Sequence, residues 1–258
     1  MKGRWHGRIA YLAAVGSVLL VWQVASLFLP RFLLPGIPDT VLRLVRTLAT
    51  ADFLDQVGQS FVRLGIGYPI GVVLGAFLGL LAGLSRSFGL YLRSLVSLVQ
   101  SVPPITWVPF LIILFDFGNV PVVIVVAMAT FFPMALAVLN GTEGVRRTHV
   151  ELAQVMGASP WQVLTKVYAP ETVPAAVTGA QVSFGNAYRT LIAAEMVSGS
   201  SKGLGWAISY AGETADMAGV LAGIVVVGAS AALMDNLVLE RVKQRLLHWR
   251  TVGGEGRV

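Results

Sequence analysis

Six long apolar runs limit what this chain can fold into. A helix needs about 20 consecutive apolar residues to cross the roughly 30 Å hydrocarbon core of a bilayer. Each run is that long or longer, and only 12% of all residues are charged, whereas soluble domains have about a quarter. We therefore predict an all-α membrane protein with six transmembrane helices in one domain, residues 1–258. The predicted spans are residues 9–29, 62–84, 90–115, 119–140, 173–197 and 217–239.

Basic residues predict the orientation of these spans. An even number of spans puts both termini on one side, and loops richer in Lys and Arg face the cytoplasm. With both termini cytoplasmic, thirteen basic residues lie inside and five outside. The net charge of +6 then needs no nucleic-acid partner. The five outer residues are Arg31, Arg43, Arg46, Arg63 and Lys202.

The first run has a second possible meaning, a secretory signal. Lys2, Arg4 and Arg8 precede it, and small residues follow at Ala25 and Ser26. The run is longer than a typical signal core and five more runs follow it, which favours a membrane span.

Residues for metal binding or catalysis are scarce. The chain has no cysteine, and His6, His149 and His248 are scattered without the spacing of metal ligands. The spans contain no histidine or cysteine that could serve an intramembrane enzyme as base or nucleophile. We expect no metal, no cofactor and no catalytic residue on this chain.

Glycines recur at every fourth position of the second span, at Gly67, Gly71, Gly75, Gly79 and Gly83. Residues four apart lie on one face of a helix. A stripe of glycine lets the backbone of another helix approach closely. We therefore predict a tightly packed helix pair at this face.

Two spans carry features of a transport path. Pro103 and Pro104 interrupt the third span; broken helices often line a path, but a kink packed against a neighbour would look the same in the sequence. The fifth span has a broad polar flank. Arg189 of this span either faces a water-filled path or makes a permanent bond to a carbonyl group or to Glu195. The candidates on this flank are Gln181, Asn186, Arg189 and Glu195.

A polar helix-turn-helix pattern lies between the fourth and fifth spans. A first helix over about residues 143–156 should stop at Gly157, a residue suited to the left-handed conformation. Ser159 and Gln162 form a capping box for a second helix, which Pro170 should end. The pattern is similar to a DNA-binding motif, but membrane spans flank it and its second helix has one cation. We therefore expect it to dock a cytoplasmic protein.

This pattern resembles the signature of a known family. The stretch "ELAQVMGASPWQVLTKVYAP", residues 151–170, is similar to the E-A-A-x3-G-x9-I-x-L-P motif of ATP-binding-cassette (ABC) importer permeases. Leu152, Val167 and Ala169 replace the motif's alanine, isoleucine and leucine, and all three exchanges are apolar. The similarity continues through "PGIPDTVLRLVRTL", "SVPPITWVPFLIILFDFG" and "IAAEMVSGSSKGLGWAI". With "MAGVLAGIVVVG" following, the chain looks most like the nitrate, sulfonate and taurine branch.

The resemblance implies a type I ABC importer permease fold and several partners. Two copies, or one copy and a close paralogue, would pair in a bacterial cytoplasmic (inner) membrane, and an extracytoplasmic binding protein would deliver substrate. Residues 143–172 would couple to a separate ATPase that binds ATP and Mg²⁺; this chain has no phosphate loop and would not be an enzyme. The implied ATPase-docking residues are Glu151, Leu152, Ala153, Met156, Gly157, Ala158, Ser159, Pro160 and Trp161.

The sequence leaves the substrate open. A pathway arginine favours a small anion such as a sulfonate, taurine or nitrate, while related permeases carry thiamine precursors, riboflavin or bicarbonate. A secondary transporter driven by an ion gradient is the other class of function. It should need several intramembrane carboxylates, and only Glu195 is well placed.

Overall fold

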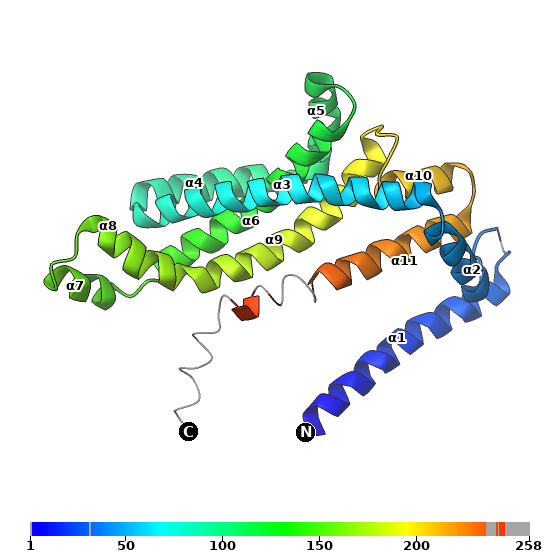
Figure 1. Ribbon diagram of the computed structural model, residues 1–258, viewed down its shortest axis with the longest axis horizontal. Helices are drawn as coiled ribbons and strands as arrows, with labels where there is room; N and C mark the ends of the chain where they lie inside the picture. Colours follow the sequence, from blue (N-terminus) through cyan, green and yellow to red (C-terminus); the bar gives the residue numbers. More distant parts are fainter. Residues whose placement is uncertain (1, 31, 236–240, 242, 246–258) are drawn as a thin grey trace.

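The computed structural model describes residues 2–30, 32–235, 241 and 243–245, and every regular element within them is a helix (Figure 1). The predicted all-α fold is confirmed for this part of the chain. The end of the last predicted span, residues 236–239, and the C-terminus lie outside the described residues. The elements are α1 (Lys2–Phe28), α2 (Ile37–Leu48), α3 (Ala51–Leu84), α4 (Arg86–Gln100), the 3-10 helix η1 (Pro104–Trp107), α5 (Val108–Phe115), α6 (Asn119–Glu143), α7 (Arg147–Val155), α8 (Pro160–Val163), the π-helical turn η2 (Leu164–Tyr168), α9 (Ala169–Val197), α10 (Leu204–Glu213) and α11 (Met217–Met234).

Three of the described helices, α3, α6 and α11, are long and apolar enough to cross a membrane. A fourth candidate is the pair formed by α4 with η1 and α5, which is bent by 77°. The predicted spans 9–29 and 173–197 fall on α1 and α9. A total of six spans and the cytoplasmic position of both termini remain predictions.

The glycine stripe of α3 packs against α6, as predicted. A Cβ atom on Gly71 would lie 2.5 Å from the carbonyl oxygen of Ala127 and 2.5 Å from Cβ of Thr130. A Cβ atom on Gly75 would lie 2.8 Å from the carbonyl oxygen of Phe131. These distances are shorter than van der Waals contact, so the two backbones approach this closely only because the side chains are absent. The same holds at Gly67, Gly79 and Gly83.

On its other side α6 packs against α9, which makes α6 the central helix (Figure 1). Small residues meet here as well. A Cβ atom on Gly141 would collide with Cβ of Ala175, and one on Gly179 would lie 2.5 Å from Cβ of Ala137. The most deeply buried apolar residues of α6 are Val122, Val125, Val126, Ala135 and Leu139.

The predicted interruption of the third span is also confirmed. α4 ends at Gln100, and Pro103 has backbone angles of φ −55° and ψ 133°, an extended conformation that ends any helix. η1 and α5 then continue in a new direction, and Figure 1 shows α5 projecting away from α3, α4 and α6.

Two short helices, α2 and α10, have no long apolar run that would predict them. Figure 1 places both at one end of the long helices, with α7 and α8 at the opposite end. α3 also begins at Ala51, well before the predicted start of its span at residue 62. These additions lie at the end that the charge distribution assigns to the outside.

Replacing Gly71 by alanine should weaken the contact between α3 and α6. Overpacking of this kind costs about 1–3 kcal/mol, which lowers the melting temperature of a chain of this size by about 2–4 °C per kcal/mol. Gly65→Ala is the matched control on the same helix, because a Cβ atom there meets nothing within 4 Å. Equal melting temperatures for the two variants in detergent would contradict the close packing.

Candidate functional site

The polar element between α6 and α9 has the predicted turn and cap. α7 ends at Val155, and Gly157 has a φ of +81°, the left-handed conformation that stops a helix. The backbone N–H of Gln162 donates to Ser159 Oγ at 3.3 Å, and the backbone N–H of Ser159 donates to Gln162 Oε1 at 2.8 Å. This capping box and the glycine stop hold the two short helices in a defined turn.

Two boundaries of this element differ from the prediction. α6 extends to Glu143, so the first helix begins at Arg147 and not near residue 143. The prediction that the second helix ends at Pro170 is wrong. In the π-helical turn η2 the N–H of Ala169 donates to the carbonyl of Leu164, and α9 follows without a break. Pro170 has no N–H to donate, and the wider π-helical turn directly before it accommodates the proline within the continuous helix.

The large apolar side chains of α7 and α8 form an exposed surface, which we call the docking patch. Its members are Leu152 (60% exposed), Val155 (86%), Met156 (79%) and Trp161 (70%). Apolar side chains that are exposed together usually mark an interaction site. Val155 was not among the predicted docking residues. Of the others, Ala153 and Ala158 are half-buried, and the exposed ones are Glu151, Gly157, Ser159 and Pro160.

The polar flank of α9 faces a cavity of about 530 Å³ between α9 and α11. Gln181, Tyr188 and Arg189 line it from α9, and Asp235 lines it from the end of α11. The Arg189 side chain is exposed, and its Nε donates to the carbonyl oxygen of Gly185 at 2.8 Å. Arg189 therefore makes the bond to a carbonyl group that was one of its predicted structural roles. With this bond formed, Arg189 still lies at the wall of the cavity.

The other pathway candidates are not gathered at this cavity. Asn186 accepts a long hydrogen bond of 3.5 Å from Nη2 of Arg189. Pro103 is exposed and Pro104 is half-buried at the break before η1, and neither lines the cavity between α9 and α11. The structure thus brings Gln181 and Arg189 together and leaves the prolines apart from them.

Glu195 lies inside the protein and not on an open path. Its side chain is fully buried, and Oε1 lies 2.7 Å from Nη1 of Arg63 on α3. Ser60 Oγ donates to the same carboxylate at 2.8 Å, and the backbone N–H of Gly205 donates at 3.0 Å. The suggested pair between Glu195 and Arg189 is not formed. Desolvation of a buried ion pair is costly unless its hydrogen bonds are all made, and this carboxylate has several donors.

Arg63 is the residue of this site that the sequence analysis misses. Its position near the start of a predicted span suggests an exposed cation, but it is only 3% exposed. Its Nε donates to Asn119 Oδ1 and its Nη1 donates to the carbonyl oxygen of Lys202, both at 2.8 Å. Arg63 therefore connects α3 with the start of α6 and with the loop before α10.

The segment "SGSSKGLG", which is the loop before α10 and the first two residues of that helix, packs against this ion pair. Gly203 has a φ of +132°, and a Cβ atom on it would lie 2.5 Å from Cδ of Glu195. A Cβ atom on Gly205 would lie 2.7 Å from Cβ of Glu195. The two glycines let the loop close over the carboxylate. Lys202 in the same loop pairs with Asp55 of α3, whose hydrogen bond and charge raise the pKa of the lysine above its ordinary value.

Removing one partner of the buried ion pair should destabilise the chain more than removing both. Glu195→Gln leaves the Arg63 guanidinium buried without a counter-charge, which costs about 3–5 kcal/mol. The double variant Arg63→Met with Glu195→Gln should recover part of the lost melting temperature. Asp55→Asn is the control, because it breaks an exposed pair that contributes about 0–1 kcal/mol. A double variant less stable than Glu195→Gln alone would contradict this interpretation.

Known proteins are similar to this chain along most of its length. Residues 71–246 match the family model of the binding-protein-dependent transport system inner membrane component. The taurine transport system permease protein TauC of Escherichia coli (strain K12) is 31% identical over 96% of this chain and 94% of its own length. The putative aliphatic sulfonates transport permease protein SsuC of Bacillus subtilis (strain 168) is 29% identical over 95% and 89%. The bicarbonate transport system permease protein CmpB of Synechococcus elongatus is 26% identical over 92% and 89%.

The fold has a solved counterpart as well. A structure described as an inward-facing conformation of the MetNI methionine ABC transporter has a TM-score of 0.57 at 20% identity, and the match covers 83% of this chain and 96% of that chain. At this identity the likeness shows the fold alone. The family model and the taurine permease together show that this chain belongs to the family of inner membrane components of binding-protein-dependent transport systems.

Proposed function

We propose that this chain is the permease of an ATP-driven importer that carries a small anion, such as a sulfonate, taurine or nitrate, across the bacterial cytoplasmic membrane. Relatives named for taurine and aliphatic sulfonates support this substrate class, and a relative named for bicarbonate supports a second candidate. The observation that carries the proposal is the docking patch, which is apolar, exposed and held on a defined turn between two long helices.

The docking patch can bind a soluble partner whose movement is then transmitted to the membrane helices. Burying apolar surface contributes about 25 cal/mol per Å², so covering the exposed side chains of Met156 and Trp161 favours association. The glycine stop and the capping box keep the patch in one shape, and a rigid element transmits a movement better than a flexible one. We infer that the partner is an ATPase subunit, which binds ATP and Mg²⁺ and supplies the hydrolysis.

The positions of charges support a cytoplasmic docking patch. Arg86 begins α4, and Arg93 of the same helix pairs with Glu143 at the end of α6. Arg146 and Arg147 lie at the start of α7, and Lys166 lies in η2. An excess of basic residues marks the cytoplasmic side of a membrane protein. The opposite end, with α2 and α10, would then meet the extracytoplasmic binding protein.

We expect the working unit to contain two copies of this chain, or one copy with a close paralogue. Each chain has one docking patch, whereas two ATPase subunits have to close on each other around ATP. Two patches are therefore needed for the two subunits to move the permease together.

Gly157→Trp should separate membrane insertion from coupling. A tryptophan at a left-handed position costs about 1–2 kcal/mol and distorts the turn, whereas Gly157→Asn keeps it, because asparagine adopts this conformation more readily. In native mass spectra of the complex that co-purifies with the tagged chain, the wild type and Gly157→Asn should show two permease and two ATPase subunits. Gly157→Trp should lose ATPase subunits or hydrolyse ATP without transport. Full composition with normal transport in Gly157→Trp would contradict the coupling role, and one permease with two ATPase subunits would contradict the pairing.

The cavity between α9 and α11 is the proposed wall of the transport path. Its volume and its polar residues, Gln181, Tyr188 and Arg189, suit a small polar solute. A guanidinium at the wall offers an anion a charge-assisted hydrogen bond that a neutral solute cannot use to the same extent. Asn186 extends this polar surface, and the break at Pro103 and Pro104 stays a second candidate for the path.

Arg189→Gln should reduce transport of the anion without reducing the amount of assembled complex. A hydrogen bond to a charged group contributes about 1.5–3 kcal/mol, so the fall in transport efficiency should be about tenfold or more. Arg189→Lys keeps the charge and should retain more transport than Arg189→Gln in proteoliposomes. Normal transport in Arg189→Gln, or failure of the complex to assemble, would contradict the pathway role.

A further inference from the structure

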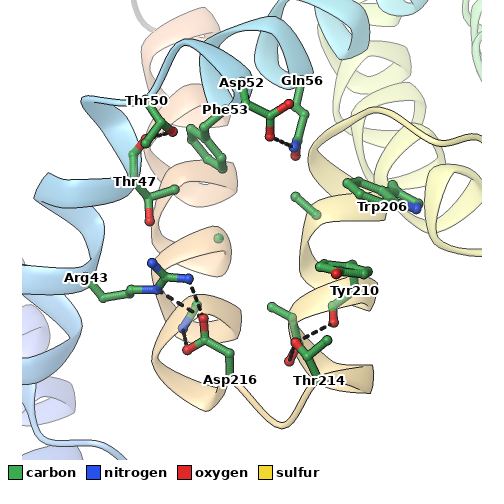
Figure 2. A pocket seen from close by; sticks show the side chains of 14 residues that line it. Arg43, Thr47, Thr50, Asp52, Phe53, Gln56, Trp206, Tyr210, Thr214 and Asp216 are labelled. Atoms are coloured by element: carbon green, nitrogen blue, oxygen red, sulfur yellow. Dashed lines mark hydrogen bonds and ion pairs between the residues drawn. The ribbon is translucent and has the colours of Figure 1, made fainter.

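A second cavity lies at the other end of the molecule, between α2, α3, α10 and α11 (Figure 2). Its volume is about 320 Å³, within the range of about 300–1,000 Å³ that holds small-molecule ligands. Residues from four separate segments line it, and none of them lines the cavity beside Arg189. It is therefore a distinct pocket, at the end that the charge distribution assigns to the outside.

One wall of this cavity has an unmet hydrogen-bond acceptor. Gln56 is only 6% exposed, and its Nε2 donates to Asp52 Oδ2 at 2.8 Å. The carboxylate accepts and cannot donate, so chemistry fixes which end of the amide faces it. The other end, Oε1 of Gln56, is buried and has no hydrogen-bond partner. A buried acceptor without a donor is costly, so this wall of the cavity favours a further donor close to Asp52 and Gln56.

A basic side chain, Arg43, lies across the cavity from the acceptor groups of Asp52 and Gln56. Arg43 of α2 donates from Nε to Asp216 Oδ2 at 3.0 Å, and about half of its side chain is exposed. Asp216 is fixed in turn, because its Oδ1 accepts from the backbone N–H of Gly219 at 2.9 Å at the start of α11. Figure 2 shows this pair on a different side of the cavity from Asp52 and Gln56. The held guanidinium presents a site for an anionic group.

Aromatic rings complete the wall on α10. Trp206 and Tyr210 stack with ring centroids 5.0 Å apart and planes at 16° (Figure 2). Such rings offer apolar surface to a short hydrocarbon chain, and they attract cations that lie over an open face.

We propose that this cavity binds a small molecule that carries a primary ammonium group and an acidic group joined by a short carbon chain. The ammonium group donates to the exposed carboxylate of Asp52, on the side of the cavity where Oε1 of Gln56 lies without a donor, and the acidic group lies toward Arg43. Two sources supply this chemistry: a free amino acid or aminosulfonate on the outer side, and the ethanolamine phosphate headgroup of a membrane lipid.

Binding is tested on the full chain in detergent with three probes: 3-aminopropanoate, which has both groups, and propanoate and ethylamine, which have one each. The first should raise the melting temperature, and the other two should not. Asp52→Asn should weaken the Kd for 3-aminopropanoate about tenfold or more, while Asp55→Asn, on the same helix outside the cavity, should leave it unchanged. Arg43→Gln should likewise weaken it, and Arg46→Gln on the same face of the membrane should not.

The lipid source is tested by native mass spectrometry of the chain released from nanodiscs with and without phosphatidylethanolamine. A retained phosphatidylethanolamine that Asp52→Asn loses and Asp55→Asn keeps would assign the cavity to the headgroup. Binding of 3-aminopropanoate without lipid retention would assign it to a free solute. The proposal is overturned if neither ligand binds in a way that depends on Asp52. Because these measurements need neither ATPase nor transport, their outcome is independent of the proposed import function.

Discussion

The close approach of α3 to α6 is the contact on which the rest of the structure depends. Lipid is as apolar as leucine, so burying apolar side chains between membrane helices gains little, and association relies on tight van der Waals contact and on polar bonds. The glycines from Gly67 to Gly83 supply the tight contact along the shared interface. With α6 held in this way, Gly141 and Gly179 repeat the arrangement between α6 and α9, and the central three helices become one unit.

Polar contacts join other elements to this unit at its two ends, and the two contacts differ in strength. At the α10 end the buried pair of Arg63 and Glu195 joins three elements. At the α7 end Arg93 of α4 donates to Asn140 and pairs with Glu143, both at 2.9 Å, near the end of α6. This second pair is about half exposed, and exposed pairs contribute about 0–1 kcal/mol. At the end that bears the docking patch, α4 is therefore held to α6 by the weaker of the two polar contacts.

Features that depend on neighbouring residues could be predicted from the sequence, and features that depend on packing could not. The left-handed stop at Gly157 and the cap at Ser159 involve residues a few positions apart, and the glycine stripe needs only the helical period. The prediction that the second helix ends at Pro170 was wrong because proline normally stops a helix. No local sequence pattern predicts the π-helical turn that accommodates this proline. Arg63 and Glu195 are 132 positions apart, so their pairing, and with it the burial of Arg63, exists only after α3 and α9 have packed. The two cavities arise in the same way, from helices that the chain order does not bring together.

The π-helical turn η2 fixes a rotational phase between two surfaces. From Pro160 to Val197 the backbone is helical without interruption, so the surface around Trp161 and the polar flank of α9 stand at a set angle about a common, bent axis. A π-turn holds one more residue than an α-helical turn, and each residue of an α-helix turns the chain by about 100°. Loss of a single residue from this turn would rotate the flank that bears Gln181 and Arg189 toward a different neighbour, with every helix still intact. The length of five residues, more than any side chain among them, therefore determines which face of α9 is aligned with the coupling surface.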